Sequence, residues 1–147
     1  MKIAVISDTH NYWRGPLPGA LAAADEIWHL GDICRPEILF SLAHLKVPVF
    51  NVRGNCDARM DWPLTLYLER MGLRFYLIHI PPRRAPENCD VLLHGHTHIP
   101  RDEVISNVRY LNPGCVSNPK WGVPTSFAWL ELDKDKTMRW ELVLLDS

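Results

Sequence analysis

The feature that most constrains this fold is a series of short apolar segments that alternate with segments of helical pattern. Ile3–Ser7, Glu26–Leu30 and Pro48–Val52 read as buried strands, because each is a short apolar run bounded by polar or glycine residues. Between them lie two segments with helix signals, the alanine-rich Pro16–Asp25 and the leucine-patterned Arg35–Leu45. Strands connected by helices of this length predict right-handed crossovers and a parallel sheet.

The rest of the chain predicts shorter connections and more antiparallel pairing. The strands expected here are Leu64–Leu68 and Leu73–Ile80 around the turn Arg70-Met71-Gly72, then Asp90–His94, Val104–Ile105 with Val108–Leu111, and Ser126–Leu132 with Thr137–Leu145. In the last strand, every second residue from Met138 to Leu144 is apolar, so one face is expected to be buried. We expect residues 1–147 to form one α/β domain.

The composition argues against several classes of protein. Sixteen Lys and Arg residues oppose 17 Asp and Glu residues, and no basic stripe is interleaved with aromatic residues, so no strong nucleic-acid binding is expected. The apolar runs are far shorter than the roughly 18 residues of a membrane span, so we expect no membrane association. The cysteines form no C-x-x-C pair, and we expect a cytoplasmic protein with four reduced, mostly buried thiols: Cys34, Cys56, Cys89 and Cys115.

Side chains of metal-ligand type follow the predicted strands at the point where each strand ends. They are Asp8, His10, Asp32, Asn55, His79, His96 and His98. In open α/β sheets, ligands bind outside the carboxyl ends of the strands, so these side chains are expected to converge. Taken singly, each motif has a simpler interpretation: Gly31-Asp32 suits a turn or helix cap, and Gly54-Asn55 suits a turn. Unrelated turns would not place a ligand after each apolar run in succession.

The calcineurin-like metallophosphoesterases have five motifs that this chain resembles in order: Asp8-Thr9-His10, Gly31-Asp32, Gly54-Asn55-Cys56-Asp57, His79 and Gly95-His96-Thr97-His98. The chain also resembles the small phosphodiesterases of the YfcE type, because Asn112-Pro113-Gly114 is similar to the Asn-Pro-Gly-Ser loop of that group. The likeness spans Met1 to about Leu132. It implies a four-layer α-β-β-α sandwich, with two sheets face to face, helices outside, and a dinuclear metal centre at the loop ends.

The resemblance also implies how the ligands divide between two divalent ions. One ion would be held by Asp8, His10 and His98, the other by Asn55, His79 and His96, and Asp32 would bridge the two. Mn²⁺ is the first candidate, with Fe²⁺, Ni²⁺ and Zn²⁺ as alternatives, because borderline ions accept mixed imidazole and carboxylate ligands. Two such ions can hold a hydroxide and grip a phosphoryl oxygen. Their charge would attract a phosphate locally, although the chain as a whole carries a formal charge of −1.

Two departures from the family pattern concern substrate choice. Cys56 stands where many members have a histidine that protonates the leaving oxygen, and a thiol is a poorer general acid near neutral pH. Two roles are therefore open for Cys56: it is a catalytic acid, or it only fills space beside the metal. After His79 the chain runs through a short, proline-rich passage where the family often has a helix. Arg14 and His94 are candidate substrate-binding residues. The alternative for Arg14 is a solvated surface position, and the alternative for His94 is a residue that supports the site.

The function expected from this pattern is metal-dependent hydrolysis of a small phosphodiester, with Asp32, Asn55 and Cys56 as catalytic residues. The main alternative is a protein-binding scaffold on the same fold, but scaffold members tend to have lost ligands, and here all seven are present. A nuclease component would need added DNA-binding segments, for which this chain has no room. A homodimer is a further expectation, based on the predicted exposed hairpins.

Overall fold

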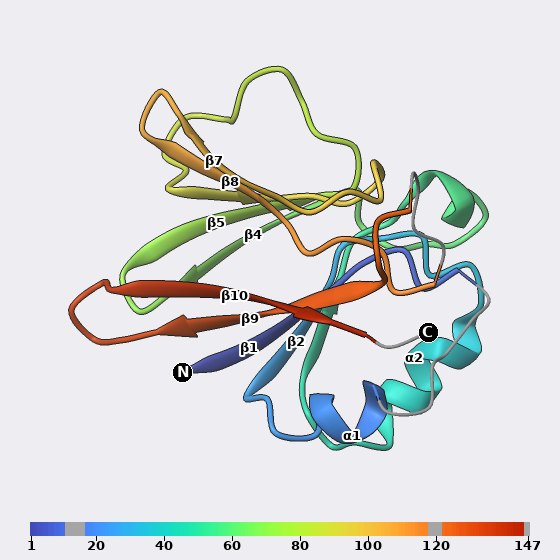
Figure 1. Cartoon of the computed structure of the whole chain (residues 1–147). Coiled ribbons are helices and arrows are strands. Elements are labelled where there is room, and N and C mark those ends of the chain that lie inside the picture. Colours follow the sequence, from blue (N-terminus) through green and yellow to red (C-terminus); the bar gives the residue numbers. More distant parts are fainter. Residues whose placement is uncertain (11–16, 118–121, 146–147) are drawn as a thin grey trace.

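Two five-stranded sheets lie face to face in the computed structural model, which describes residues 1–10, 17–117 and 122–145 (Figure 1). No helix in this part of the chain is long and apolar enough to cross a membrane. Along the chain the elements are β1 (Lys2–Ile6), α1 (Leu17–Leu21), β2 (Glu26–His29), α2 (Pro36–Ala43), β3 (Val49–Asn51), η1 (Asn55–Asp57), β4 (Thr65–Arg70), β5 (Leu73–Ile78), β6 (Val91–Leu93), β7 (Arg101–Ile105), β8 (Val108–Asn112), β9 (Ser126–Leu132) and β10 (Met138–Leu144).

The first sheet has the order β10-β9-β1-β2-β3, and its β1, β2 and β3 are parallel, as the alternating pattern predicts. The antiparallel hairpin of β9 and β10 extends this sheet beyond β1. The second sheet has the order β4-β5-β6-β8-β7. Its two hairpins turn through residues with positive φ, Met71 and Gly72 in one and Ser106 and Asn107 in the other, as two-residue hairpin loops require.

Three apolar layers hold the sandwich together. The layer between the sheets includes Trp28 and Phe75, whose rings meet edge to face at 5.1 Å. Helices α1 and α2 cover the outer face of the first sheet through residues such as Leu21 and Leu42, both fully buried (Figure 1). The β-strands are therefore fixed on both faces, and the loops at their carboxyl ends project from a packed support.

The outer face of the second sheet is covered by the segment 80–89 instead of a helix (Figure 1). Ala85 packs there beside Tyr110, and its backbone N–H donates a hydrogen bond to the tyrosine hydroxyl at 3.1 Å. The α/β sandwich expected from the sequence is thus confirmed. In the described part of the chain, the layer outside the second sheet is a proline-rich coil. This agrees with the short, proline-rich sequence after His79, where the family often has a helix.

Helix α1 is shorter than the predicted Pro16–Asp25 segment, whose first residue lies outside the described residues. After Leu21 the backbone tightens into a turn, with the N–H of Ala24 bonded to the carbonyl of Leu21 at 3.1 Å. The next residue, Asp25, already donates its N–H to Lys2 at the edge of β1. Pairing with the sheet therefore ends the helix early, in spite of the alanine-rich sequence.

The prediction of one buried face along β10 is wrong for its second half. Met138 and Trp140 pack against the core between the sheets, but Leu142 and Leu144 are exposed on the same face. β10 is an edge strand, and the apolar layer between the sheets ends along it, because Trp140 packs against that layer and Leu142 does not. A cavity of about 370 Å³, lined by Arg101 on β7 and by Trp140 and Leu142 on β10, lies at this point.

Candidate metal centre

The candidate ligands lie on five loops, each of which leaves the carboxyl end of a strand. Asp8 and His10 follow β1, Asp32 follows β2, and the others follow in the same way: Asn55 after β3, His79 after β5, and His96 and His98 after β6. Backbone hydrogen bonds join these loops directly. The N–H groups of Asp8 and His10 donate to the carbonyls of Gly31 and Asp32, at 3.0 and 2.9 Å. The structure thus brings all seven side chains to one end of the sandwich.

Four of the seven form one compact group. One ligand atom from each of Asp8, His10, Asp32 and His98 lies within 4.8 Å of the others. The Oδ1 atom of Asp8 is 3.2 Å from Nε2 of His98 and 3.8 Å from Nε2 of His10. Three of these side chains are buried, and His10 is partly exposed. This group has the membership that the family resemblance implies for one metal ion and its bridge.

The other three candidates form a second group against Asp32. The Nε2 atom of His79 is 3.3 Å from Asp32 Oδ2 and 3.0 Å from Asn55 Oδ1. His96 approaches the same amide oxygen, with Nδ1 at 3.1 Å from Asn55 Oδ1. Asp32 Oδ2 also lies 3.9 Å from Nε2 of His10, so this carboxylate stands between the two groups. Its position suits a bridging ligand.

The donor atoms fit a pair of divalent cations. Asp8 Oδ1 and His10 Nε2 are buried and make no hydrogen bond among the described residues, although buried polar atoms are normally hydrogen-bonded. Both atoms face the first group, where a cation would satisfy them. His79 is oriented in the way that metal-bound imidazoles usually are, because its Nδ1–H donates to the Leu30 carbonyl at 2.8 Å and leaves Nε2 toward the site. The mixed carboxylate, imidazole and amide set suits a borderline ion.

The backbone at the site is strained. Five candidate ligands adopt left-handed φ values: Asp8 at 56°, His10 at 48°, Asp32 at 57°, His96 at 71° and His98 at 64°. This conformation costs roughly 1–2 kcal/mol per residue for a non-glycine side chain. Such strain persists only where the surrounding structure enforces it, and it gathers at functional sites. The concentration of strain at these loops is independent evidence of function.

Charges at the site favour a cation. Burial by itself would raise the pKa of Asp32, but hydrogen bonds from His79 and from the Cys56 backbone N–H lower it well below its usual range. Burial opposes charge on His79, yet the hydrogen bond to Asp32 and the charge of Asp8 raise the pKa of that imidazole overall. The Asp32 carboxylate therefore stays ionised and stabilises positive charge next to it.

Asp57 is a structural residue of the site whose role the sequence reasoning missed. Its buried carboxylate accepts hydrogen bonds from four backbone N–H groups, those of Asp32, Ile33, Cys34 and Gly54, at 2.8 to 3.2 Å. It therefore ties the loop after β2 to the loop after β3. The signal was present in Gly54-Asn55-Cys56-Asp57, where a carboxylate follows a turn that contains glycine and asparagine.

The loop that carries His96 and His98 is supported from beneath by Asn112. The side-chain N–H of Asn112 donates to the Gly95 carbonyl at 3.2 Å and to Thr97 Oγ1 at 3.0 Å. His94, a candidate substrate-binding residue, is buried below the same loop. Its Nδ1 bonds to the Gly95 carbonyl at 2.9 Å and its Nε2 accepts from Arg101 at 3.1 Å. These contacts are those of a supporting residue, and burial together with the nearby Arg101 lowers the pKa of His94 to about 4.

His29 has a similar supporting position. It is fully buried, its Nε2 lies 3.0 Å from Thr9 Oγ1, and its Nδ1 accepts the Gly31 N–H at 3.1 Å. Burial lowers the pKa of His29 to about 4, so the imidazole is neutral at physiological pH. The other candidate substrate-binding residue, Arg14, lies outside the described residues.

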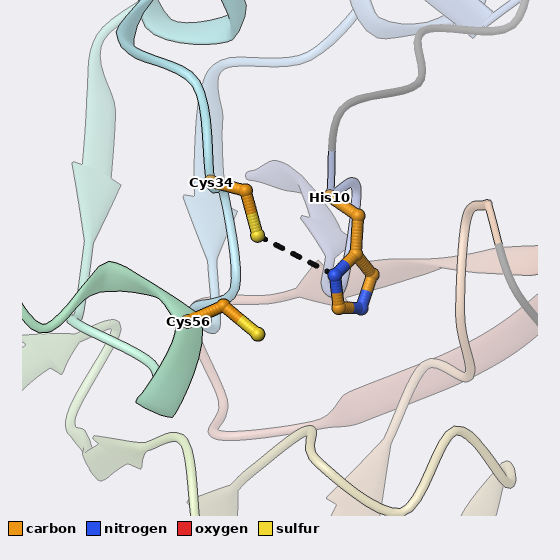
Figure 2. Close-up of side chains that lie close together, drawn as sticks. All are labelled: His10, Cys34 and Cys56. Carbon is orange, nitrogen blue, oxygen red and sulfur yellow. Dashed lines mark hydrogen bonds between the residues drawn. The ribbon is translucent and has the colours of Figure 1, made fainter.

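Two cysteines lie on the open side of the first group. Figure 2 shows Cys34, in the loop after β2, directed toward His10, with Cys56 of η1 close by. The sulfur of Cys34 is 3.4 Å from Nδ1 of His10, and one ligand atom from each of the three residues lies within 4.8 Å of the others. Burial is the main cause that raises the pKa of the Cys34 thiol, to about 12, and it also raises that of Cys56.

The expectation of mostly buried thiols is therefore wrong for this pair. Cys89 and Cys115 are buried, whereas Cys34 is half-buried and Cys56 is exposed. The physical reason is their position, because both follow strand ends, outside the three apolar layers formed by the described residues.

An apolar cavity of about 240 Å³ adjoins the second group. His79 and Asn55 are among the residues that line it, and Leu64, Ile78 and Ile80 contribute apolar surface. Leu64 and Ile80 are each at least half exposed, so the cavity opens to solvent next to the candidate metal ligands. It can receive an apolar substituent of a molecule bound at those ligands.

Comparisons with known proteins found relatives both in sequence and in structure. The pattern of the Calcineurin-like phosphoesterase superfamily domain matches residues 1–135. Phosphodiesterase YfcE of Escherichia coli K12 is 32% identical over 145 residues, covering 89% of this chain and 72% of that protein. The structure of Yfce, a phosphoesterase from E. coli, superposes with a TM-score of 0.74 at 26% identity, over 99% of this chain and 100% of that chain.

A second solved structure has the same fold at lower identity. Wild-type Vps29 of Entamoeba histolytica, complexed with Zn²⁺, has a TM-score of 0.75 at 21% identity, over 98% of this chain and 99% of that chain. With the family pattern matched over most of its length, this chain belongs to the calcineurin-like phosphoesterase superfamily.

Proposed function

We propose that this protein is a dinuclear-metal phosphodiesterase that cleaves a P–O bond in a small diester. The observation that carries the proposal is the convergence of Asp8, His10, Asp32 and His98, in which Asp8 Oδ1 and His10 Nε2 are buried without a hydrogen bond. Metal ions at this place, with Mn²⁺ as the first candidate, would polarise the phosphoryl oxygen and supply a hydroxide near neutral pH. Fe²⁺, Ni²⁺ and Zn²⁺ suit the same donor set.

The residues of the chain divide the remaining work. Asp8, His10 and His98 would hold one ion, Asn55, His79 and His96 the other, and Asp32 would contact both. Hydrogen bonds to backbone groups keep these ligands in place before substrate arrives, as with His79 and the Leu30 carbonyl. The ionised Asp32 would hold the positively charged metal ions close to the bound phosphate.

Cys56 is the candidate proton donor to the leaving oxygen. Its side chain is exposed and adjoins Asn55, and its raised pKa keeps a proton on Sγ throughout the neutral range. Because such a thiol is a weak acid, we infer that the enzyme prefers leaving groups that need little protonation, such as aryl phosphates or strained cyclic phosphodiesters.

The apolar cavity beside His79 supports a diester over a monoester. A diester carries a second organic group on phosphorus, and the surfaces of Leu64 and Ile80 offer that group an apolar support close to Asn55. A monoester would leave a charged oxygen on this side. We propose an aromatic or nucleoside-like substituent for this cavity. We also propose that the protein acts in the cytoplasm as a homodimer, with no membrane partner and no strong nucleic-acid binding.

The experiment that tests this proposal is hydrolysis of bis-p-nitrophenyl phosphate by EDTA-stripped protein, before and after Mn²⁺ is added. We expect turnover to depend on the added ion and to be much weaker with the monoester p-nitrophenyl phosphate. Asp32→Asn should lower turnover by about 100-fold or more, because it removes a shared ligand. The matched control is Asp90→Asn, at the opposite end of β6, where the carboxylate pairs with Arg74.

Two outcomes would contradict the proposal. Undiminished turnover with two bound ions in Asp32→Asn would show that the ligand assignment is wrong. No turnover with any divalent ion, in spite of stoichiometric binding, would favour a protein-binding scaffold on this fold, and the next step would then be a search for a protein partner.

A further inference from the structure

The second face of His10 is a separate feature of the site. Its Nε2 is turned toward Asp8 and Asp32, at 3.8 and 3.9 Å, whereas its Nδ1 is turned toward the sulfur of Cys34 at 3.4 Å. Figure 2 shows Cys56, from η1, beside Cys34, and one ligand atom from each of the three residues lies within 4.8 Å of the others. One imidazole therefore stands between a set of oxygen donors and a pair of sulfur donors.

We propose that Cys34, Cys56 and His10 Nδ1 form a binding site for a thiophilic divalent cation, Zn²⁺ or Cd²⁺, distinct from the carboxylate-rich centre. Sulfur and imidazole ligands select such ions, whereas carboxylates suit harder ones. Three protein ligands with a fourth position open to solvent is a common arrangement for zinc. The exposure of Cys56 leaves that fourth position accessible.

The distances fit this arrangement without movement of the backbone. In a tetrahedral site with metal–nitrogen and metal–sulfur bonds of about 2.0 and 2.3 Å, neighbouring ligand atoms lie about 3.5–3.8 Å apart. The Cys34 sulfur and His10 Nδ1 are already 3.4 Å apart, and all three ligand atoms lie within 4.8 Å of one another. A rotation of the exposed Cys56 side chain about its Cα–Cβ bond can close the remaining gap.

The local charge also favours a cation at this place. Asp32 accepts the backbone N–H of Cys56 at 2.8 Å, and Asp57 accepts that of Cys34 at 2.8 Å, so a carboxylate lies next to each thiol. When the ion binds, two metal–sulfur bonds form and the two S–H protons pass to the solvent. No electron is transferred, and the step needs no oxidant or reductant.

Occupation of this site would have a consequence for the neighbouring centre, and this consequence rests on the proposed function. A neutral imidazole offers only one nitrogen as a ligand, and the other carries a proton. With Nδ1 on the thiophilic ion, His10 Nε2 carries the proton and cannot bind an ion beside Asp8. We therefore expect Zn²⁺ or Cd²⁺ at this site to inhibit the Mn²⁺-dependent hydrolysis.

The test is a Cd²⁺ titration of the full-length, metal-stripped protein, reduced with a non-thiol reductant and kept in excess Mg²⁺ to occupy the oxygen donors. Cadmium–thiolate absorption in the ultraviolet should rise to saturation at one ion per chain. Cys34→Ser and Cys56→Ser should each remove about half or more of this absorption, and the double variant all of it. The control is Cys89→Ser, because Cys89 is buried on the outer face of the second sheet and should not contribute.

His10→Ala should keep the two-thiolate absorption at saturation but weaken Cd²⁺ binding by roughly tenfold or more. The proposal is overturned if no thiolate absorption develops, or if the Cys34→Ser, Cys56→Ser double variant behaves like the wild type. Selective alkylation of the exposed Cys56 in the folded wild-type protein provides the same comparison if a serine variant fails to fold.

The two proposals fail separately. Thiolate absorption without any Mn²⁺-dependent hydrolysis would support the cysteine site and contradict the phosphodiesterase. Hydrolysis without thiolate absorption would do the reverse. Both proposals would be supported if Cd²⁺ inhibits hydrolysis by the wild type and by Cys89→Ser but inhibits Cys56→Ser much less. The rate of each protein with Cd²⁺ is compared with the rate of the same protein without it.

Discussion

At the scale of single residues, the candidate centre depends as much on side chains that hold loops as on those that face the site. Asp57 shows this most clearly, since one buried carboxylate accepts four backbone N–H groups from two loops. Those loops carry Asp32 and Asn55, which come from different strands. A residue that contacts no substrate can thus decide whether two ligands lie within reach of the same ion.

We predict that Asp57→Asn lowers the free energy of unfolding by about 2–4 kcal/mol. The amide keeps one acceptor oxygen, but its NH₂ group faces backbone donors, and each unsatisfied buried donor costs about 1–3 kcal/mol. Urea unfolding of the metal-free protein measures the loss. Asp61→Asn, at an exposed position after η1, should change stability by less than about 0.5 kcal/mol, and an equal effect of the two variants would refute this role of Asp57.

The second residue-scale prediction concerns Cys56 as the proton donor. Cys56→His places an imidazole, whose ordinary pKa is near 6.5, where a thiol with a raised pKa now stands. Turnover should rise most for alkyl phosphodiesters, because an alkoxide leaving group needs a proton more than an aryl oxide does. Rates on an alkyl and an aryl diester, measured with the same Mn²⁺ loading, give the comparison. An equal change for both would assign Cys56 a space-filling role.

At the scale of elements, the strands provide a support, and the strained loops determine the site. Close packing between loops explains why glycine precedes several ligands. A Cβ on Gly54 would overlap the backbone N and the carboxylate of Asp32, and a Cβ on Gly95 would overlap Ser7 and come within 2.7 Å of Asp8. Each glycine allows a ligand from another strand to come close.

The element-scale prediction compares two Gly→Ala substitutions. Gly54→Ala should lower the free energy of unfolding by about 1–3 kcal/mol through overpacking. It should also weaken Mn²⁺ binding by about tenfold, because the loops after β2 and β3 must separate. Gly19→Ala, in α1 where a Cβ meets nothing within 4 Å, should instead stabilise the protein by up to about 1 kcal/mol. Calorimetric unfolding measures the change in stability, and Mn²⁺ titration measures the change in affinity. If Gly54→Ala keeps both its stability and its Mn²⁺ affinity, the close-packing argument is wrong.

At the scale of the whole molecule, two histidines are buried as neutral groups beneath the site. Burial lowers the pKa of both His29 and His94 to about 4. An unfolded chain takes up a proton on histidine near pH 6.5, so between these values the unfolded state binds more protons than the folded state. Stability therefore falls as the pH drops from about 6.5 to 4, by roughly 3 kcal/mol for each histidine.

We predict that His94→Asn reduces this acid sensitivity. The variant should be less stable than the wild type at pH 7, because it breaks the contact with Arg101, but the difference should shrink as the pH falls toward 4. Urea unfolding of the metal-free proteins at several pH values provides the measurement. A difference that stays constant from pH 7 to pH 4 would show that His94 does not carry the proton linkage.

Much of the fold could be predicted from the sequence because its patterns are local. The short apolar run Glu26–Leu30 and the paired strands around Ser106-Asn107 depend on neighbours along the chain, and both elements form where the sequence indicates. The exposure of Leu142 could not be predicted, because it depends on how far the opposite sheet extends over β10. The early end of α1 likewise depends on the hydrogen bond between Asp25 and Lys2 of β1, not on the alanines.

The sequence by itself determined the order of elements, the superfamily and the identity of the candidate ligands, because apolar periodicity and motif residues are properties of neighbouring positions in the chain. Only the tertiary structure decided which side chains stand together: Asp57 between two loops, an apolar cavity beside His79, and two thiols on the second face of His10. The physical reason is that these contacts join loops from different strands. Their distances depend on the packing of two sheets, which no local pattern contains.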